Sequence, residues 1–89
     1  MITETYWVYV LELMDGRKYI GHTNNLERRL QEHQTGRSPY TTRNKAKQLL
    51  HFEIYNSRGE AMKREKFLKT GKGRELLKQK LAEQSTLGG

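Results

Sequence analysis

One carboxylate in this sequence occupies a position that should face the protein interior. Ala61, Glu65 and Leu68 fall at i, i+4 and i+7 of a segment with helical spacing, so they share one face. Burying a carboxylate there is unfavourable unless it is paired or holds a cation. Two interpretations of Glu65 stay open. It is a ligand for Mg²⁺ or Mn²⁺, hard cations that take oxygen donors, or it forms a salt bridge with a nearby lysine or arginine.

An arginine and a histidine are one helical turn apart earlier in the chain. Arg29 and His33 are i, i+4 neighbours, so their side chains should lie side by side. The arginine could hold a phosphate with two hydrogen bonds and stabilise charge that develops on it. The histidine could bind a phosphate or orient Tyr9. The alternative is a solvated arginine beside a histidine at a helix end.

Tyr9 and Tyr19 are ordinary residues for strands, where packing on a half-buried sheet face would explain both. A catalytic interpretation requires a cationic site, because a free phenol has a pKa near 10 and is a poor base at neutral pH. A metal and Arg29 close by would lower that pKa and let the tyrosine oxygen accept a proton from water.

The charge of the chain favours a polyanionic partner. Lys and Arg number 17 against 10 Asp and Glu, a formal net charge of +7, and such side chains displace counterions from phosphates. Residues 37–48 are polar and basic, contain the only proline, and are typical of a surface loop. We predict that this loop contacts DNA, although the residues do not distinguish DNA from RNA and a merely solvated loop is the alternative. The predicted nucleic-acid contacts are Arg37, Tyr40, Arg43, Lys45 and Lys47.

Composition excludes several other classes of site. Cysteine is absent, which removes disulfides, thiolate zinc sites and cysteine nucleophiles. We find no signal peptide and no apolar run long enough to span a bilayer, so we expect a cytoplasmic protein with no membrane partner. The length of 89 residues suits one domain, which we place at residues 1–84 with a flexible tail at 85–89.

A hairpin at the start of the chain should position the two tyrosines. Residues 6–13 and 18–22 have strand character, with a turn at Asp15 and Gly16. A two-residue turn would place Tyr9 and Tyr19 on opposite faces. A three-residue loop, residues 14–16 with Gly16 left-handed, places them on the same face, with Tyr19 opposite Leu11. If both tyrosines serve one site, the loop is therefore of the three-residue type.

The remaining elements complete an α+β domain. A helix capped by Asn24 should end at Gly36, and a strand should cover residues 49–55. Ser57 and Glu60 should begin a second helix, which ends before Gly71, and residues 74–83 should form a third. The predicted order is ββαβαα, a small three-stranded antiparallel sheet flanked by helices.

The order of these segments resembles the GIY-YIG nuclease superfamily, and the resemblance covers residue 7 to about residue 77. It is most similar to short stand-alone bacterial members that resemble the nuclease domain of the excision-repair incision subunit. The ordered set is more specific than Tyr-Ile-Gly alone. It consists of Val8-Tyr9, Tyr19-Ile20-Gly21, residues 23–30 with His33, and residues 60–69.

The resemblance implies a role for each candidate residue. Tyr9 corresponds to the tyrosine of the first motif, proposed to act as general base or to position the attacking water, and Tyr19 to that of the second motif. Arg29, rather than Arg28, matches the arginine that stabilises the phosphate, because Leu30 and His33 follow it as in the family pattern. His33 matches a frequent helix histidine, and Glu65 the carboxylate that holds one divalent metal. The implied reaction is hydrolysis of one DNA strand.

The chain also departs from the family pattern. Trp7 replaces the glycine that begins the first motif, and Val8 replaces an isoleucine. No asparagine of the kind that some members supply late in the domain stands out after Glu65. Many members carry a separate DNA-binding domain that these 89 residues do not contain. We therefore expect dimerisation or a partner protein to supply specificity.

Overall fold

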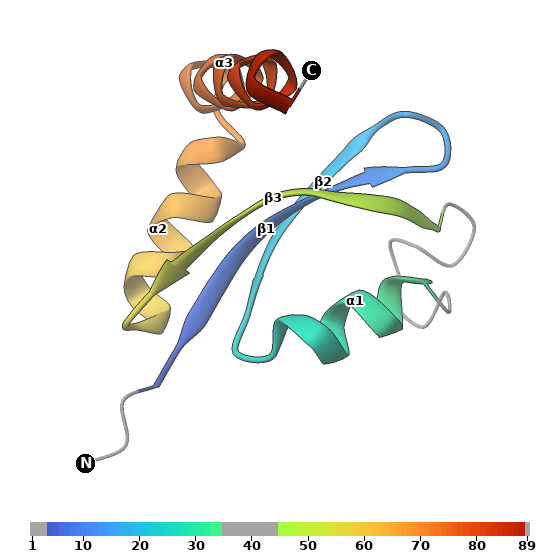
Figure 1. The fold of residues 1–89 in the computed structure, drawn as a ribbon. Helices are drawn as coiled ribbons and strands as arrows, with labels where there is room; N and C mark the ends of the chain where they lie inside the picture. The colour runs from blue at the N-terminus through green and yellow to red at the C-terminus, as the bar shows by residue number, and fades with distance from the viewer. Residues whose placement is uncertain (1–3, 35–44, 89) are drawn as a thin grey trace.

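The computed structural model describes residues 4–34 and 45–88, and these residues form an α+β domain in the predicted order. The sheet has strand order β2-β1-β3, with β1 antiparallel to both neighbours. Helices α2 and α3 lie on one side of the sheet and α1 on the other (Figure 1). The elements are β1 (Tyr6–Leu13), β2 (Lys18–Thr23), α1 (Leu26–Gln34), β3 (Ala46–Tyr55), α2 (Arg58–Leu68) and α3 (Gly71–Gly88).

The hairpin has the three-residue loop that a shared tyrosine site requires. Gly16 has a φ of 90°, in the left-handed region that glycine tolerates best, and its N–H donates to the Leu13 carbonyl at 2.9 Å. In the resulting register Tyr19 lies opposite Leu11, and Gly21 opposite Tyr9. The predicted register is confirmed, and both tyrosines belong to the same sheet face.

The central strand β1 is buried on both faces, and each face anchors different helices. Val8 and Val10 pack with Ile20 and with residues of α2 and α3, namely Ala61, Leu68 and Leu77. Tyr9, Leu11 and Leu13 pack on the opposite face with Leu26 and Leu30 of α1. The second helix therefore buries the Ala61–Leu68 face that the sequence indicates.

Two helix starts differ from the predictions. Asn25, rather than Asn24, caps α1, because its side-chain Oδ1 accepts the Arg28 N–H at 3.1 Å. Helix α3 begins at Gly71 instead of residue 74, because the Thr70 hydroxyl accepts the Gly73 N–H at 3.1 Å and caps the helix. This helix continues to Gly88 and so includes residues 85–88, which the sequence assigned to a tail. Ser57 caps α2 as predicted, whereas Gly36 lies outside the described residues.

Strand β3 begins at Ala46, three residues earlier than predicted. Leu50, Phe52 and Ile54 alternate with polar residues along it, but this alternation does not mark the buried face. A register shift next to Leu11 places Leu50 against the core shared with α2 and α3. Phe52 and Ile54, which pair with Tyr9 and Trp7, are 48% and 59% exposed. No described helix is long and apolar enough to cross a membrane.

Candidate active site

Three of the predicted site residues form an aromatic group on the α1 face of the sheet. The ring centroids of Tyr9 and Tyr19 are 6.1 Å apart, and those of Tyr19 and His33 are 4.9 Å apart. A buried hydrogen bond of 3.1 Å joins Tyr9 Oη to His33 Nε2. Strand β1, strand β2 and helix α1 each supply one ring, so the hairpin register and the packing of α1 together build this group.

Gly21 is the residue over which the Tyr9 phenol lies. A Cβ atom at position 21 would stand 2.6 Å from Tyr9 Oη and 2.8 Å from Tyr9 Cζ, closer than real Cβ contacts allow. The glycine is therefore required by the close approach of a side chain to the backbone, and not by its own dihedral angles. Its contribution is to position Tyr9.

Arg29 completes the group, which we call the tyrosine cluster: Tyr9, Tyr19, Arg29 and His33. A hydrogen bond with Tyr9 raises the pKa of the Arg29 guanidinium above its usual value. Arg29 Nη1 also lies 3.6 Å from Glu32 Oε1. The buried Arg29 Nε has no hydrogen-bond partner among the described residues. A buried N–H without an acceptor is unfavourable, and a phosphate oxygen is an acceptor of suitable charge.

The prediction was that a metal and Arg29 together lower the pKa of Tyr9. Burial raises that pKa to about 12, and Arg29 lowers it as predicted but by less than burial raises it. Burial, followed by the positive charge of Arg29, lowers the pKa of His33. Both groups are therefore neutral at pH 7. A neutral His33 with its proton on Nδ1 leaves Nε2 to accept the hydrogen bond from the Tyr9 hydroxyl.

Glu65 lies on α2, which covers the opposite face of the sheet from α1 (Figure 1). Its Oε1 accepts a hydrogen bond from His22 Nδ1 at 2.9 Å, and its Oε2 accepts one from Lys69 Nζ at 3.2 Å. Burial raises the pKa of Glu65, but the bonds from His22 and Lys69 outweigh it and the net shift is downward. The carboxylate is therefore ionised at neutral pH, and the salt-bridge interpretation of Glu65 describes its contacts in this structure.

These contacts do not use all the lone pairs of the Glu65 carboxylate. A carboxylate offers about four lone-pair positions, and His22 and Lys69 account for two of them. The side chain is 20% exposed, so solvent reaches it. Among the described residues no group of three or more His, Asp or Glu side chains could hold a metal. Mg²⁺ is commonly held by one or two carboxylates and completes its shell with waters and substrate oxygens, which fits this donor set.

Strand β2 connects the tyrosine cluster to Glu65. Gly21 lies beneath Tyr9, and the next residue, His22, bonds Glu65. Successive residues of a strand point to opposite faces, so the two groups lie on either side of one strand. In the described sheet β2 is an edge strand. No further described strand lies beside β2 at this edge, so none separates a ligand there from the tyrosine cluster or from Glu65.

The predicted nucleic-acid loop is described only in part. Arg37, Tyr40 and Arg43 lie outside the described residues. Lys45 and Lys47 are exposed at the start of β3, where Lys47 Nζ lies 4.0 Å from Glu12 Oε1. At the start of α1, Thr23 and Asn25 hydrogen-bond each other, so these polar groups shape the helix entry.

Sequence reasoning missed a charged network that fixes α2. The Glu53 carboxylate of β3 accepts two hydrogen bonds from Arg64, at 2.8 and 3.1 Å, and one from Tyr55 at 2.6 Å. Burial raises the pKa of Glu53, but these bonds and one from His51 lower it to about 2. Arg64 precedes Glu65, so the network fixes the helical turn that carries the candidate metal ligand. The pairing depends on which side chains of β3 face α2, and the sequence does not show this.

The chain is similar in sequence to members of one protein family. Residues 5–80 match the family model of the GIY-YIG catalytic domain, a range that contains the tyrosine cluster and Glu65. A UPF0213 protein of Haloquadratum walsbyi is 36% identical over 86 residues, which cover 96% of this chain and 94% of that protein. A UPF0213 protein of Nitratidesulfovibrio vulgaris is 42% identical over 87 residues, which cover 97% of this chain and 76% of that protein.

The fold is also similar to a solved structure. The solution NMR structure of a UPF0213 protein from Bacillus halodurans superposes with a TM-score of 0.51 at 32% sequence identity. The match covers 82% of this chain and 81% of that one. The three-stranded antiparallel sheet with flanking helices is thus shared with a relative whose structure was determined experimentally.

Proposed function

The chain belongs to the GIY-YIG family of nuclease domains, and we propose that it is an endonuclease that hydrolyses one phosphodiester bond of DNA with a single divalent cation, Mg²⁺ or Mn²⁺. The observation that carries this proposal is the tyrosine cluster. Within it the buried Nε of Arg29 has no acceptor among the described residues. The same cluster contains the Tyr9 hydroxyl, which is hydrogen-bonded to the neutral His33.

Arg29 holds the phosphate in this proposal. Its guanidinium is permanently charged and presents several N–H donors in one plane, which matches two oxygens of a phosphate. As the attacking oxygen adds to phosphorus, negative charge grows on those oxygens, and a fixed cation stabilises it. The ion pair with Glu32 holds the guanidinium in place, and its interaction with Tyr9 favours the charged form.

Tyr9 and His33 move the proton. A phenol with a pKa of about 12 does not ionise by itself at neutral pH. In the proposed step the Tyr9 oxygen accepts a proton from the attacking water while its own hydroxyl proton passes to His33 Nε2. His33 is suited to this role because burial lowers its pKa and keeps the ring neutral. Tyr19 packs against both rings and fixes their orientation.

Glu65 is the residue that would hold the cation. When bound, a divalent cation polarises the phosphate and stabilises the leaving oxygen. Lys69 and His22 keep the Glu65 carboxylate ionised and oriented from two sides. Substrate at the β2 edge would lie between Glu65 and Arg29.

A second candidate, a non-catalytic nucleic-acid-binding module, is favoured by one observation. Both Glu65 oxygens already accept hydrogen bonds, as in a purely structural salt bridge. The two functions differ in what they require of Glu65, because binding uses the lysines and arginines and does not use a carboxylate.

The test is nicking of supercoiled plasmid DNA with Mg²⁺, with Mn²⁺ and with chelator, by the wild type, Glu65→Gln and the control Glu75→Gln. Glutamine keeps an acceptor for His22, and Glu75 is an exposed glutamate of α3. We expect cation-dependent nicking by the wild type and Glu75→Gln, and a loss of about 100-fold or more in Glu65→Gln, the scale of one electrostatic stabiliser. Salt-sensitive DNA binding by all three proteins without nicking would establish the binding module instead.

A further inference from the structure

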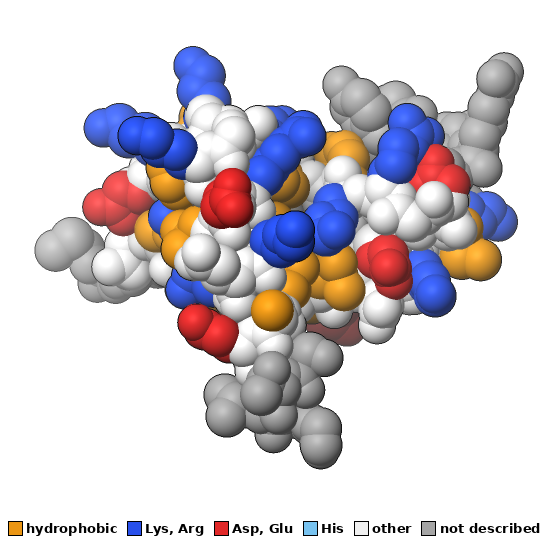
Figure 2. Space-filling model, turned by 90° about the horizontal axis from the view of Figure 1, so that it is seen from above, with side chains coloured by type: hydrophobic (Ala, Val, Ile, Leu, Met, Phe, Trp, Pro, Cys, Tyr) orange, Lys and Arg blue, Asp and Glu red, His pale blue; other side chains and the backbone are white. Residues whose placement is uncertain are grey.

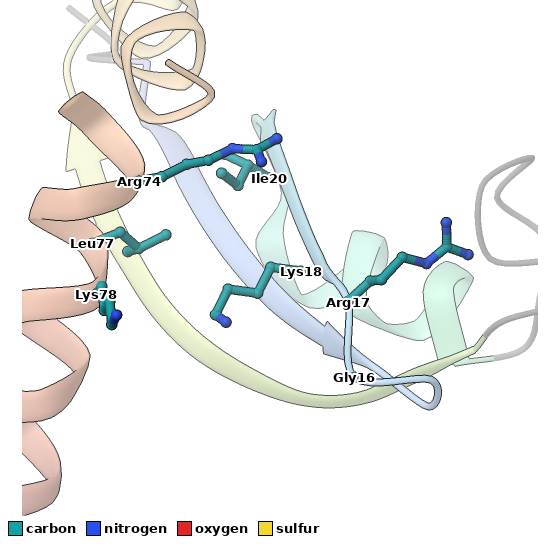
Figure 3. A pocket seen from close by; sticks show the side chains of 7 residues that line it. All are labelled: Gly16, Arg17, Lys18, Ile20, Arg74, Leu77 and Lys78. Carbon is teal, nitrogen blue, oxygen red and sulfur yellow. The ribbon is translucent and has the colours of Figure 1, made fainter. Parts of the chain in front are cut away.

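A hollow with cationic walls lies between the β1–β2 hairpin and α3. Its volume is about 510 Å³, within the range of about 300–1,000 Å³ typical of ligand pockets. Figure 3 shows the side chains that line it. We call it the basic hollow, and its lining residues are Gly16, Arg17, Lys18, Ile20, Arg74, Leu77 and Lys78.

Three of its cations have no acidic partner among the described residues. Lys18 of β2 extends toward α3, and Arg74 of α3 extends toward β2 (Figure 3). Neither these two side chains nor Lys78 forms an ion pair or a side-chain hydrogen bond with any described residue. Arg17 differs, because it points away from α3 and its Nε donates to Asp15 Oδ2 at 2.6 Å.

The arrangement of these cations favours an anionic ligand. No acidic residue belongs to the described lining. Like charges held around one hollow repel each other, and an anion between them removes that repulsion. The floor is apolar, formed by Ile20 and Leu77. Figure 2 shows Lys and Arg side chains gathered around hydrophobic ones on the face of the molecule seen from above.

The basic hollow is separate from the tyrosine cluster. Ile20 belongs to the core on the α2 and α3 face, and Lys18 lies two residues away on the same face of β2. Tyr19, between them in the sequence, belongs to the opposite face with Tyr9. Strand β2 thus presents lysine to the hollow and tyrosine to the cluster from consecutive positions at one edge of the sheet.

We propose that the basic hollow is a second phosphate-binding site, which holds backbone phosphates of the nucleic acid at a distance from the bond that is cut. Lys18, Arg74 and Lys78 contact the phosphates, and the apolar floor accommodates the sugars between them. The strand passes over the edge of β2 from the hollow to Arg29. This inference rests on the proposed function, because it takes nucleic acid as the substrate.

The experiment compares a hollow variant, Lys18→Gln/Arg74→Gln/Lys78→Gln, with a control of equal charge, Lys63→Gln/Lys66→Gln/Lys72→Gln, whose residues are exposed and lie outside the hollow. Binding of a fluorescent DNA duplex is measured in chelator over a series of salt concentrations, after both variants are shown to be folded. The logarithm of affinity falls with the logarithm of salt by about 0.9 per phosphate neutralised. We expect the slope to decrease by about 2–3 in the hollow variant and by less than about 1 in the control.

The outcomes separate this inference from the proposed function. Equal changes in the salt-dependence slope of the two variants would overturn phosphate binding by the basic hollow. The nuclease proposal would stay intact, because the measurement needs no cleavage. A mononucleotide probe distinguishes a backbone from a free phosphate ligand. Mononucleotide binding abolished only in the hollow variant, with DNA binding unchanged, would contradict a backbone site. Absence of DNA binding by the wild type would overturn both proposals.

Discussion

Tyr9 and His33 form a pair in which neither member carries a charge at neutral pH. Burial raises the pKa of the phenol to about 12, and burial with the charge of Arg29 lowers the pKa of the imidazole. A phenol with so high a pKa is a poor base by itself. The 3.1 Å contact between Oη and Nε2 gives its proton an acceptor that is unprotonated in the same pH range.

This pair predicts the acid limb of the pH profile. The pKa of His33 is lowered from 6.5, so His33 is neutral at pH 7 and becomes protonated as the pH falls through that lowered value. Protonation removes the acceptor for the Tyr9 proton, so kcat/KM should fall at pH values below 6.5. Glu65, whose pKa lies below 4.5, does not titrate in this range.

The control for this prediction is His33→Gln, which keeps a hydrogen-bonding group but cannot take up a proton. We expect a lower kcat/KM in this variant, without the acid limb. An unchanged acid limb in His33→Gln, measured with the same plasmid substrate, would show that another group accepts the proton.

At the scale of single residues, the sequence indicated which side chains meet but not their protonation states. The spacing of Arg29 and His33 left two interpretations open, and the resemblance to the family brought these residues together with Tyr9 and Tyr19 as one predicted site. The raised pKa of Tyr9 depends on how deeply α1 buries the phenol against Gly21. That depth is a property of tertiary packing, which spacing along the chain does not specify.

At the scale of elements, strand β2 positions the tyrosine cluster because Gly21 has no side chain and leaves space for Tyr9. The Tyr9 phenol lies against the backbone of Gly21 on the neighbouring strand. Gly21→Ala should displace Tyr9 Oη and separate it from His33 Nε2. We expect nicking to fall about 100-fold because displacement of about 1 Å can cost that much, and stability to fall by about 1–3 kcal/mol from overpacking.

Gly59→Ala is the matched control. Gly59 is an exposed helical residue of α2, and nothing lies within 4 Å of a Cβ built there. Alanine should stabilise the helix by about 0.5–1 kcal/mol and leave nicking unchanged. Thermal unfolding and nicking of both variants check this pair, and a fully active Gly21→Ala would contradict the proposed position of Tyr9.

The elements themselves were largely predictable, and the errors have local causes. Apolar periodicity and turn residues predicted their order, and the hairpin register followed from the condition that Tyr9 and Tyr19 share one site. The start of α3 was missed because the hydroxyl of Thr70 was not recognised as the cap of this helix. The Glu53–Arg64 pairing was missed because it joins a strand to a helix, and the register shift in β3 decides which side chains face that helix.

At the scale of the whole molecule, the sheet separates two surfaces with different chemistry. The α1 side carries the tyrosine cluster, and the α2 and α3 side carries Glu65 and the basic hollow. The formal net charge of +7 draws nucleic acid to the protein generally. The described edge at β2 is where the two surfaces meet, so the proposed substrate path crosses it.

Arg29 is proposed to act on the phosphate that is cut, and its neighbour Arg28 provides the matched comparison. Arg28 has the same charge, is exposed on α1, and contributes to the helix cap only through its backbone N–H. Alanine at either position therefore changes the net charge of the protein equally. Arg29→Lys, a second variant, keeps the charge but loses the planar arrangement of donors.

The most direct measurement is the single-turnover rate of plasmid nicking, with protein in excess over DNA, for the wild type, Arg28→Ala, Arg29→Ala and Arg29→Lys. Protein in saturating excess keeps differences in DNA affinity out of the measured rate. We predict that Arg29→Ala is slower by about 100- to 1,000-fold, the scale of one lost transition-state stabiliser, and that Arg29→Lys restores only part of the rate. Arg28→Ala should match the wild type. Nicking by Arg29→Ala at the rate of Arg28→Ala would contradict this role of Arg29.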